Sequence, residues 1–138
     1  MKTLCGIAAV GLVLLLMAAP AAAARDRDVW NGNVLLEWCR EAIQINDEGR
    51  RGSPDAIFHA GWCSGRVDGM LDMHAEYTGR SLLRSPVFCL PETGIRVPQG
   101  VRIVVRYLET HPERLHLEQR QLIIEAFSAA FPCPAPAR

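Results

Sequence analysis

The fold is decided by residues 53–74, which read SPDAIFHAGWCSGRVDGMLDMH. Ser53 is a favourable helix N-cap, Pro54 suits the first helical position, and the Asp55 carboxylate complements the positive end of the helix dipole. A helix is therefore expected to begin at Pro54. Its core-facing stripe repeats at helical spacing and consists of Ile57, Ala60, Ser64, Val67, Leu71 and His74.

The same helix carries Gly61, Gly65 and Gly69, which share a second face because they are four residues apart. Each glycine costs a helix interior about 1 kcal/mol relative to alanine. We therefore expect a neighbouring helix to pack closely against this face. The alternative is that the backbone of a binding partner lies there.

Three further helices are indicated around this one. The first begins near Asn31-Gly32-Asn33 and ends in the polar stretch Asn46–Gly52, and the second begins at Pro98. The second ends before Pro112, because a proline disfavours helical geometry in the residue before it. The third spans about Leu117–Phe131. The positions expected to be buried are Leu35, Leu36, Cys39, Ala42, Ile43, Val101, Val104, Val105, Leu108, Leu122, Ile123, Ala126, Phe127 and Ala130.

No stretch of the sequence alternates as a strand does, so the expected fold class is all-α. We predict a small single-domain bundle of about four helices, arranged as two αα-hairpins. Between the hairpins, Thr78–Val97 forms a long irregular connection. Such connections are uncommon in compact domains and often carry function.

Residues 1–24 have the pattern of a secretory signal peptide, in which Lys2 precedes the apolar core Ile7–Met17. We expect cleavage near Ala24, which leaves a single domain at 25–138 in the periplasm. The apolar core is too short for a good membrane anchor, so the mature protein is not expected to be embedded in the membrane.

The composition after the leader excludes several classes of protein. Lys2 is the only lysine, so 14 of the 15 basic residues are arginines of the mature chain, and 15 acidic residues give it a net charge of −1. Because there is no basic excess, we expect no nucleic-acid partner. The apolar content is too high for a disordered chain, and the length allows one modest core.

Four cysteines remain after the leader: Cys39, Cys63, Cys89 and Cys133. An even number in an exported chain predicts two disulfides. A Cys₄ zinc site is the alternative, but such sites bring ligands in close pairs, whereas the nearest cysteines here are 24 residues apart. In an antiparallel first hairpin Cys39 and Cys63 lie level, and the other two cysteines flank the open end of the second hairpin. We therefore expect the pairs Cys39–Cys63 and Cys89–Cys133.

Candidates for catalysis or metal binding are few. Asp68 and Asp72 lie one helical turn apart with His74 nearby, which is the basis for an alternative hydrolase or metal enzyme, although such pairs more often lie on a solvated face. His111 and His116 flank a helix break rather than having the i, i+4 spacing that directs two imidazoles to one metal. We therefore expect no catalytic residue, cofactor or metal.

Three tryptophans, Trp30, Trp38 and Trp62, are many for a small chain. Tryptophan is enriched at the energetic centres of interfaces. One or two are expected in the core, and an exposed one would indicate a binding partner.

Five short motifs occur in order along the chain: Asn31-Gly32-Asn33 followed by Cys39, Cys63-x-Gly65-x-x-x-Gly69-x-x-Asp72, Phe88-Cys89-x-Pro91, Tyr107-Leu108-x-x-His111-Pro112-Glu113-Arg114-Leu115-His116, and Ala130-Phe131-Pro132-Cys133-Pro134. Together they resemble the Rap/Tai family of exported immunity proteins, whose characterised members protect Gram-negative bacteria from peptidoglycan amidases of the type VI secretion system. The resemblance covers nearly the whole chain after the leader. One departure is Arg66, where the family usually has an aromatic residue.

The resemblance implies a disulfide-bonded helical protein, often a homodimer, that occludes the cleft of an amidase without catalysis of its own. Occlusion requires a rigid surface that loses little entropy on docking, and two disulfides would supply that rigidity. The partner-contact residues are unknown, because they lie outside the shared motifs; the candidate regions are Asn46–Gly52 and Thr78–Val97. The alternatives are a periplasmic stress chaperone, which would usually be rich in lysine, and another envelope binding protein.

Overall fold

The computed structural model describes residues 30–46, 51–83 and 85–134. The expected signal peptide and its cleavage point lie outside the described residues. The described chain folds as α3 (Gly32–Asn46), α4 (Pro54–Gly79), α5 (Val97–Thr110), the short 3₁₀ helix η1 (Pro112–Arg114) and α6 (Gln119–Ala130). These residues form no β-strand, so the all-α prediction is confirmed.

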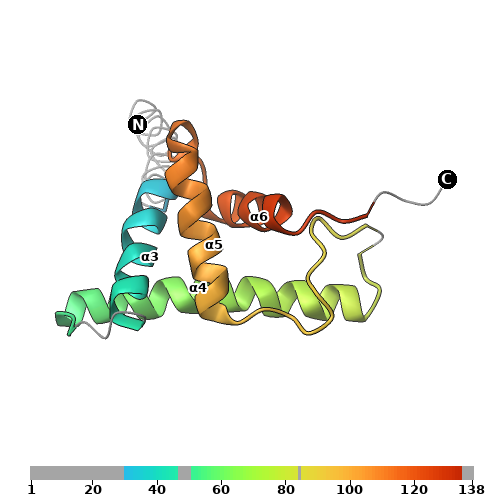
Figure 1. Cartoon of the computed structure of the whole chain (residues 1–138), viewed down its shortest axis with the longest axis horizontal. Helices are drawn as coiled ribbons and strands as arrows, with labels where there is room; N and C mark the ends of the chain where they lie inside the picture. The colour runs from blue at the N-terminus through green and yellow to red at the C-terminus, as the bar shows by residue number, and fades with distance from the viewer. Residues whose placement is uncertain (1–29, 47–50, 84, 135–138) are drawn as a thin grey trace, which may run out of the picture. The chain divides into compact units, whose positions relative to one another are not determined.

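Figure 1 shows α3 and α5 side by side, both standing across the long helix α4. α3 packs against α4 and α5, and α6 packs against α5. The C-terminal end of α6 turns toward the connection between α4 and α5, coloured yellow in Figure 1. In the part of the chain that the structure describes, no helix is both long and apolar enough to cross a membrane.

The helix starts follow from local capping. Asn31 Oδ1 accepts a hydrogen bond from the backbone N–H of Asn33 at 3.0 Å, and Ser53 Oγ accepts one from Ala56 at 3.2 Å. These are the two caps that the sequence predicts. α6 begins slightly later than expected, because the Glu118 carboxylate caps it by accepting from the backbone N–H of Arg120 at 3.1 Å.

The core is built from the apolar faces of the four helices. Most positions expected to be buried are buried, and Leu35, Cys39, Val67, Val104, Leu108, Leu122, Ile123 and Phe127 are fully so. Two expectations were wrong. Ile57 is 57% exposed, because it lies in the first turn of α4 ahead of the first buried residue of that helix, and Ala130 is exposed at the last position of α6. The connection contributes Phe88, which is 1% exposed and has no periodic pattern around it.

Two disulfides cross-link the fold, as the fold prediction expected. Cys39–Cys63 joins α3 to α4 with a Cα–Cα distance of 5.2 Å, and both cysteines are fully buried. Cys89–Cys133 joins the connection to the segment after α6 with a Cα–Cα distance of 4.9 Å. The backbone N–H of Cys89 also donates to the carbonyl of Phe131 at 2.9 Å. The connection is therefore fixed to the C-terminal end of α6.

The expectation that a helix packs against Gly61, Gly65 and Gly69 was wrong. A Cβ added at any of the three would meet nothing within 4 Å, so this face of α4 is open. The close approach occurs instead at Gly100, where a Cβ would lie 2.9 Å from Val67 Cγ1. α5 can therefore approach α4 closely only because position 100 has no side chain.

Candidate partner-binding surface

Large exposed hydrophobic side chains gather at the two ends of α4. Ile57 and Phe58 lie at its N-terminal end. The larger group, which we call the loop patch, lies at its C-terminal end and on the connection, and its members are between 39% and 59% exposed: Met73, Tyr77, Leu82, Leu83 and Val87. Single exposed hydrophobics are ordinary, whereas several on one helix end and the connection that follows it are a candidate interaction surface.

The loop patch is held in place by hydrogen bonds as well as by the Cys89–Cys133 disulfide. The backbone N–H of Leu82 donates to the carbonyl of Tyr77 at 2.8 Å, which continues the end of α4. The Ser128 hydroxyl on α6 lies 3.0 Å from the carbonyl oxygen of Val87 and 2.7 Å from that of Ile124, so its one proton is shared between the two acceptors. The exposed side chains are therefore carried on a backbone that is already ordered.

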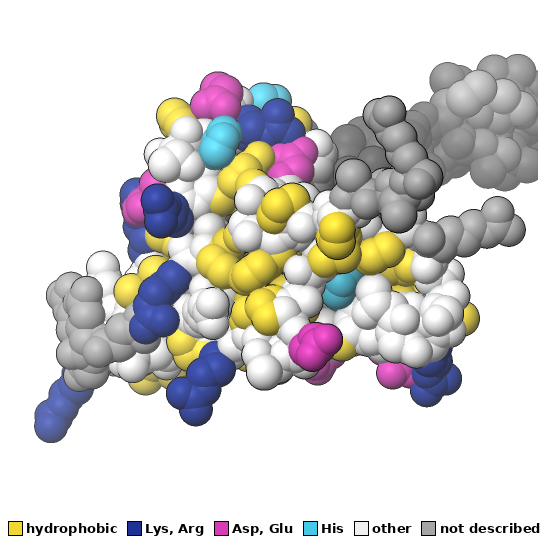
Figure 2. Space-filling model, turned by 45° about the vertical axis from the view of Figure 1, so that its right-hand side comes forward, with side chains coloured by type: hydrophobic (Ala, Val, Ile, Leu, Met, Phe, Trp, Pro, Cys, Tyr) yellow, Lys and Arg dark blue, Asp and Glu magenta, His cyan; other side chains and the backbone are white. Residues whose placement is uncertain are grey.

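A cavity of about 370 Å³ opens next to the loop patch, between the end of α4 and the connection. His74 and Thr78 line it on the α4 side, and Phe88, Leu90 and Pro91 line it from the connection. Its size falls within the roughly 300–1,000 Å³ range of ligand-binding pockets. Figure 2 shows hydrophobic side chains gathered across the middle of one face of the molecule, with charged side chains mostly toward the edges.

His74 is part of the core rather than of a catalytic cluster. The residue is 8% exposed, and its ring stacks on that of Phe88 with a centroid distance of 3.7 Å. Burial lowers the pKa of His74, and a hydrogen bond with the Phe88 backbone offsets only part of that effect. Asp68 and Asp72 are exposed on α4, so the three residues considered for a hydrolase do not form one site.

His111 and His116 also serve local structure. His111 Nδ1 lies 2.8 Å from the carbonyl oxygen of Tyr107 and its ring stacks on the Tyr107 ring, so it closes the end of α5. His116 Nδ1 lies 3.0 Å from a different carbonyl, that of Glu113. Among the described residues, no group of three or more His, Cys, Asp or Glu side chains could hold a metal ion.

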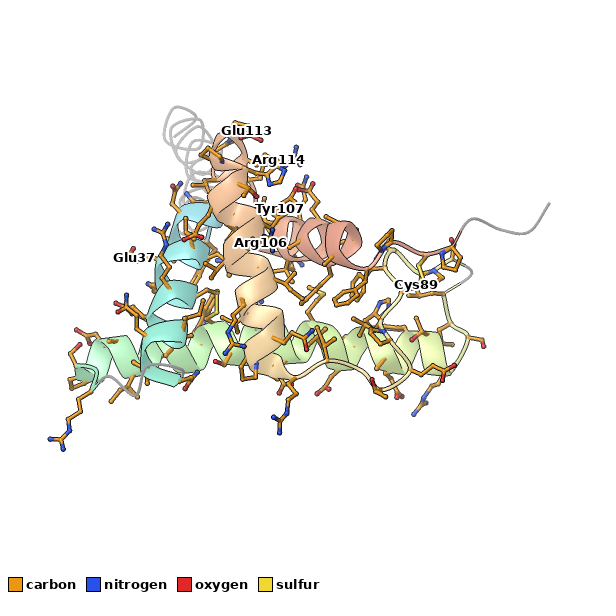
Figure 3. All side chains as sticks on the ribbon, viewed as in Figure 1. Glu37, Cys89, Arg106, Tyr107, Glu113 and Arg114 are labelled. Carbon is orange, nitrogen blue, oxygen red and sulfur yellow. A yellow bond between two sulfur atoms is a disulfide. The ribbon has the colours of Figure 1, made fainter. Side chains whose placement is uncertain are left out.

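A polar network that sequence reasoning missed joins α5, η1 and α6. Tyr107 donates its hydroxyl to Glu125 Oε2 at 3.0 Å, and Arg114 donates its Nε–H to the same oxygen at 3.0 Å. Gln121 donates to Glu125 Oε1 at 3.0 Å. Figure 3 shows Tyr107 and Arg114 on the side of α5 and η1 that faces α6.

The network also sets the charge state of Glu125. Burial alone would raise the pKa of Glu125, but the hydrogen bonds from Gln121, Arg114 and Tyr107, with the charge of Arg114, lower it overall. Burial and the hydrogen bond to Glu125 raise the pKa of Tyr107. Glu125 is therefore held as a carboxylate that ties the three elements together.

An aromatic cluster lies where α3 packs against α4. Trp38 stacks on His59 with a centroid distance of 4.2 Å and meets the edge of Trp62 at 4.9 Å. His59 Nδ1 lies 2.7 Å from Glu41 Oε2. Trp38 and Trp62 are each half-buried, and so is Trp30 at the start of the described residues.

Of the two candidate contact regions, one carries large exposed hydrophobic side chains in the structure. The connection expected at Thr78–Val97 runs from Arg80 to Arg96, because α4 extends to Gly79 and α5 begins at Val97, and it carries most of the loop patch. Residues 47–50 of the Asn46–Gly52 turn lie outside the described residues. The assignment of partner-contact residues therefore stays a prediction.

The fold defines a small helical protein that is cross-linked by two disulfides. The family model for Rap1a immunity proteins matches residues 31–133. The chain therefore belongs to the Rap1a immunity protein family. No curated protein and no solved structure matches it.

Proposed function

We propose that the protein is a periplasmic immunity protein that binds and occludes a peptidoglycan amidase delivered by a type VI secretion system. Family membership supports an immunity role, and the two disulfides suit an oxidising compartment. The sequence pattern of residues 1–24 supports export. Occlusion needs no catalytic residue, so we propose that the protein is not an enzyme.

The observation that carries this proposal is the loop patch. Its exposed side chains would each lose apolar surface to a partner, at about 25 cal/mol per Å² removed from water. The disulfide and the Ser128–Val87 hydrogen bond hold the connection before the partner arrives. Little conformational entropy would then be lost on binding, which is the usual requirement for tight inhibition by shape.

The test uses the amidase encoded nearest to the gene of this protein. Oxidised immunity protein is added in increasing amounts to the purified amidase, and hydrolysis of peptidoglycan is followed by separation of the released fragments. We expect hydrolysis to stop near one equivalent of immunity protein. Full hydrolysis in the presence of a large excess would overturn the proposal.

We also propose that the protein forms a homodimer, because the family resemblance implies one. Sedimentation equilibrium of the oxidised protein tests this separately from inhibition. A mass of one chain at all concentrations would remove the dimer from the proposal without affecting occlusion.

A further inference from the structure

Two arginines from different helices share one carboxylate at the side of α4. Arg120 of α6 places its Nε 2.9 Å from Glu118 Oε1, and Arg66 of α4 places a guanidinium nitrogen 3.9 Å from the same oxygen. Glu118 also caps α6, so its second oxygen accepts from backbone N–H groups. Among the described residues, two positive charges thus share this one carboxylate.

Arg66 makes fewer hydrogen bonds than Arg120. Within the described part of the chain its guanidinium makes no hydrogen bond, and its Nε is buried without a partner. Its guanidinium lies 3.9 Å from the Glu118 oxygen and over the Trp62 ring, whose centroid is 5.8 Å from the guanidinium carbon. Guanidinium groups carry five donors, and native structures seldom leave a buried donor unpaired. The accessible nitrogens of Arg66 therefore have donor capacity in reserve.

A hollow of about 230 Å³ lies beside these two arginines. It is lined by Gly65, Arg66, Gly69, Met70, Met73 and Arg120. None of these described lining residues carries a carboxylate, so the wall of the hollow is cationic. Gly65 and Gly69 leave it open, because a side chain at either position would project into free space. Met73 also belongs to the loop patch, so the hollow borders the loop patch at this residue.

We propose that this hollow receives the carboxylate of an Asp or Glu side chain on the protein that covers the loop patch. The planar guanidinium of arginine matches a carboxylate, with which it can form paired charge-assisted hydrogen bonds. The methylene groups of the incoming side chain would lie against Met70 and Met73, whose flexible thioethers adapt to irregular contacts. This inference rests on the proposed function for the identity of the partner, but its chemistry can be tested without that partner.

The direct test is an NMR titration of the full oxidised protein that follows the Nε–H signals of Arg66 and Arg120. One probe is a short peptide, acetylated at its N-terminus and amidated at its C-terminus, with a single glutamate between leucines, and the other has glutamine in its place. In the wild type, we expect only the glutamate peptide to shift the Arg66 and Arg120 signals. The control is the double variant Arg66→Gln/Arg120→Gln, in which we expect neither peptide to shift the signals of the remaining arginines. Equal shifts with both peptides, or no shift with either, would overturn the inference.

A second arm uses the amidase. We expect Arg66→Gln/Arg120→Gln to weaken binding about tenfold, because two half-exposed charge contacts are lost, and Arg106→Gln, an exposed arginine outside the hollow, to change it by less than about twofold. If the double variant binds as tightly as the wild type, the inference fails while the proposed function stands. If no amidase binds the wild type, the proposed function fails and the peptide titration alone decides the inference.

Discussion

Two glycines illustrate how the surroundings of a residue decide its effect. At Gly100 a Cβ would lie 2.9 Å from Val67 Cγ1 and 3.4 Å from the tip of the Phe127 ring, so α5 depends on the missing side chain. At Gly65 a Cβ would meet nothing within 4 Å. The first position is constrained by packing, whereas the second only carries the entropic cost of glycine in a helix.

The first prediction compares Gly100→Ala with Gly65→Ala. Gly100→Ala should lower the free energy of unfolding by about 1–3 kcal/mol, because the new methyl overpacks the core. Gly65→Ala should raise it by up to about 1 kcal/mol, because alanine is the better helix former. Urea denaturation of both variants measures the two changes. A loss of stability in Gly65→Ala would show that this face of α4 is covered within the protein itself.

The second prediction concerns His74. Burial lowers its pKa in the folded state, so below about pH 6.5 the unfolded chain binds a proton that the folded protein does not. The stability that the neutral ring provides is therefore present above pH 6.5 and is lost as the pH falls toward the folded-state pKa. His74→Phe keeps a ring against Phe88 and removes this titration.

We expect the free energy of unfolding of the wild type to fall more steeply between pH 7 and pH 5 than that of His74→Phe. The two proteins differ only at residue 74, so the difference between the two slopes isolates His74. Parallel slopes in urea denaturation at several pH values would mean that His74 is solvated in the folded state.

At the scale of the elements, the Glu125 network holds η1 and α6 to α5. Glu125→Gln keeps the shape of the side chain but removes the charge that Arg114 and Tyr107 face, and should cost about 1–2 kcal/mol of stability near neutral pH. Because the folded-state pKa of Glu125 is lowered, its contribution is present above about pH 4.5 and is lost as the pH falls through the folded value. The difference from the wild type should therefore shrink in acid. A constant difference from pH 7 to pH 3, measured by urea denaturation, would contradict this third prediction.

The elements were predictable where the signals are local. Ser53, Pro54 and Asn31 start helices through contacts within one turn, and the 3.6-residue pattern places Val104 and Leu108 in the core. Phe88 could not be predicted, because its burial depends on His74 and Phe127 from distant segments.

The candidate surface was predictable only as a region. The length of the connection indicated function, but nothing in its sequence showed which side chains would be exposed. The glycines of α4 were misread for a related reason. A glycine stripe is the same in sequence whether or not a neighbour covers it, and only the tertiary arrangement shows that this face is open.

At the scale of the whole molecule, the two disulfides differ in accessibility. Cys39 and Cys63 are fully buried, whereas Cys89 and Cys133 are half-buried. Reduction requires a thiolate to reach a sulfur atom, so access controls its rate. The half-buried disulfide is also the one that fixes the connection, which carries Leu82, Leu83 and Val87 of the loop patch.

The fourth prediction is that a limited amount of reductant opens Cys89–Cys133 before Cys39–Cys63. Brief reduction followed by alkylation and peptide mass spectrometry should find the label first on Cys89 and Cys133. Simultaneous labelling of all four cysteines would mean that the protein opens globally before either disulfide is reduced.

The most direct test of the central claim, that the protein acts by binding an amidase through the loop patch, is calorimetric titration of that amidase with matched variants. Val87 in the loop patch and Ile57 at the other end of α4 are each 57% exposed, so Val87→Glu and Ile57→Glu introduce the same charge at equally exposed positions. We predict a nanomolar dissociation constant for the wild type, a change of less than about threefold for Ile57→Glu, and an increase of about a hundredfold or more for Val87→Glu. Dissociation constants that are the same for Val87→Glu and Ile57→Glu, or no binding by the wild type, would contradict the account.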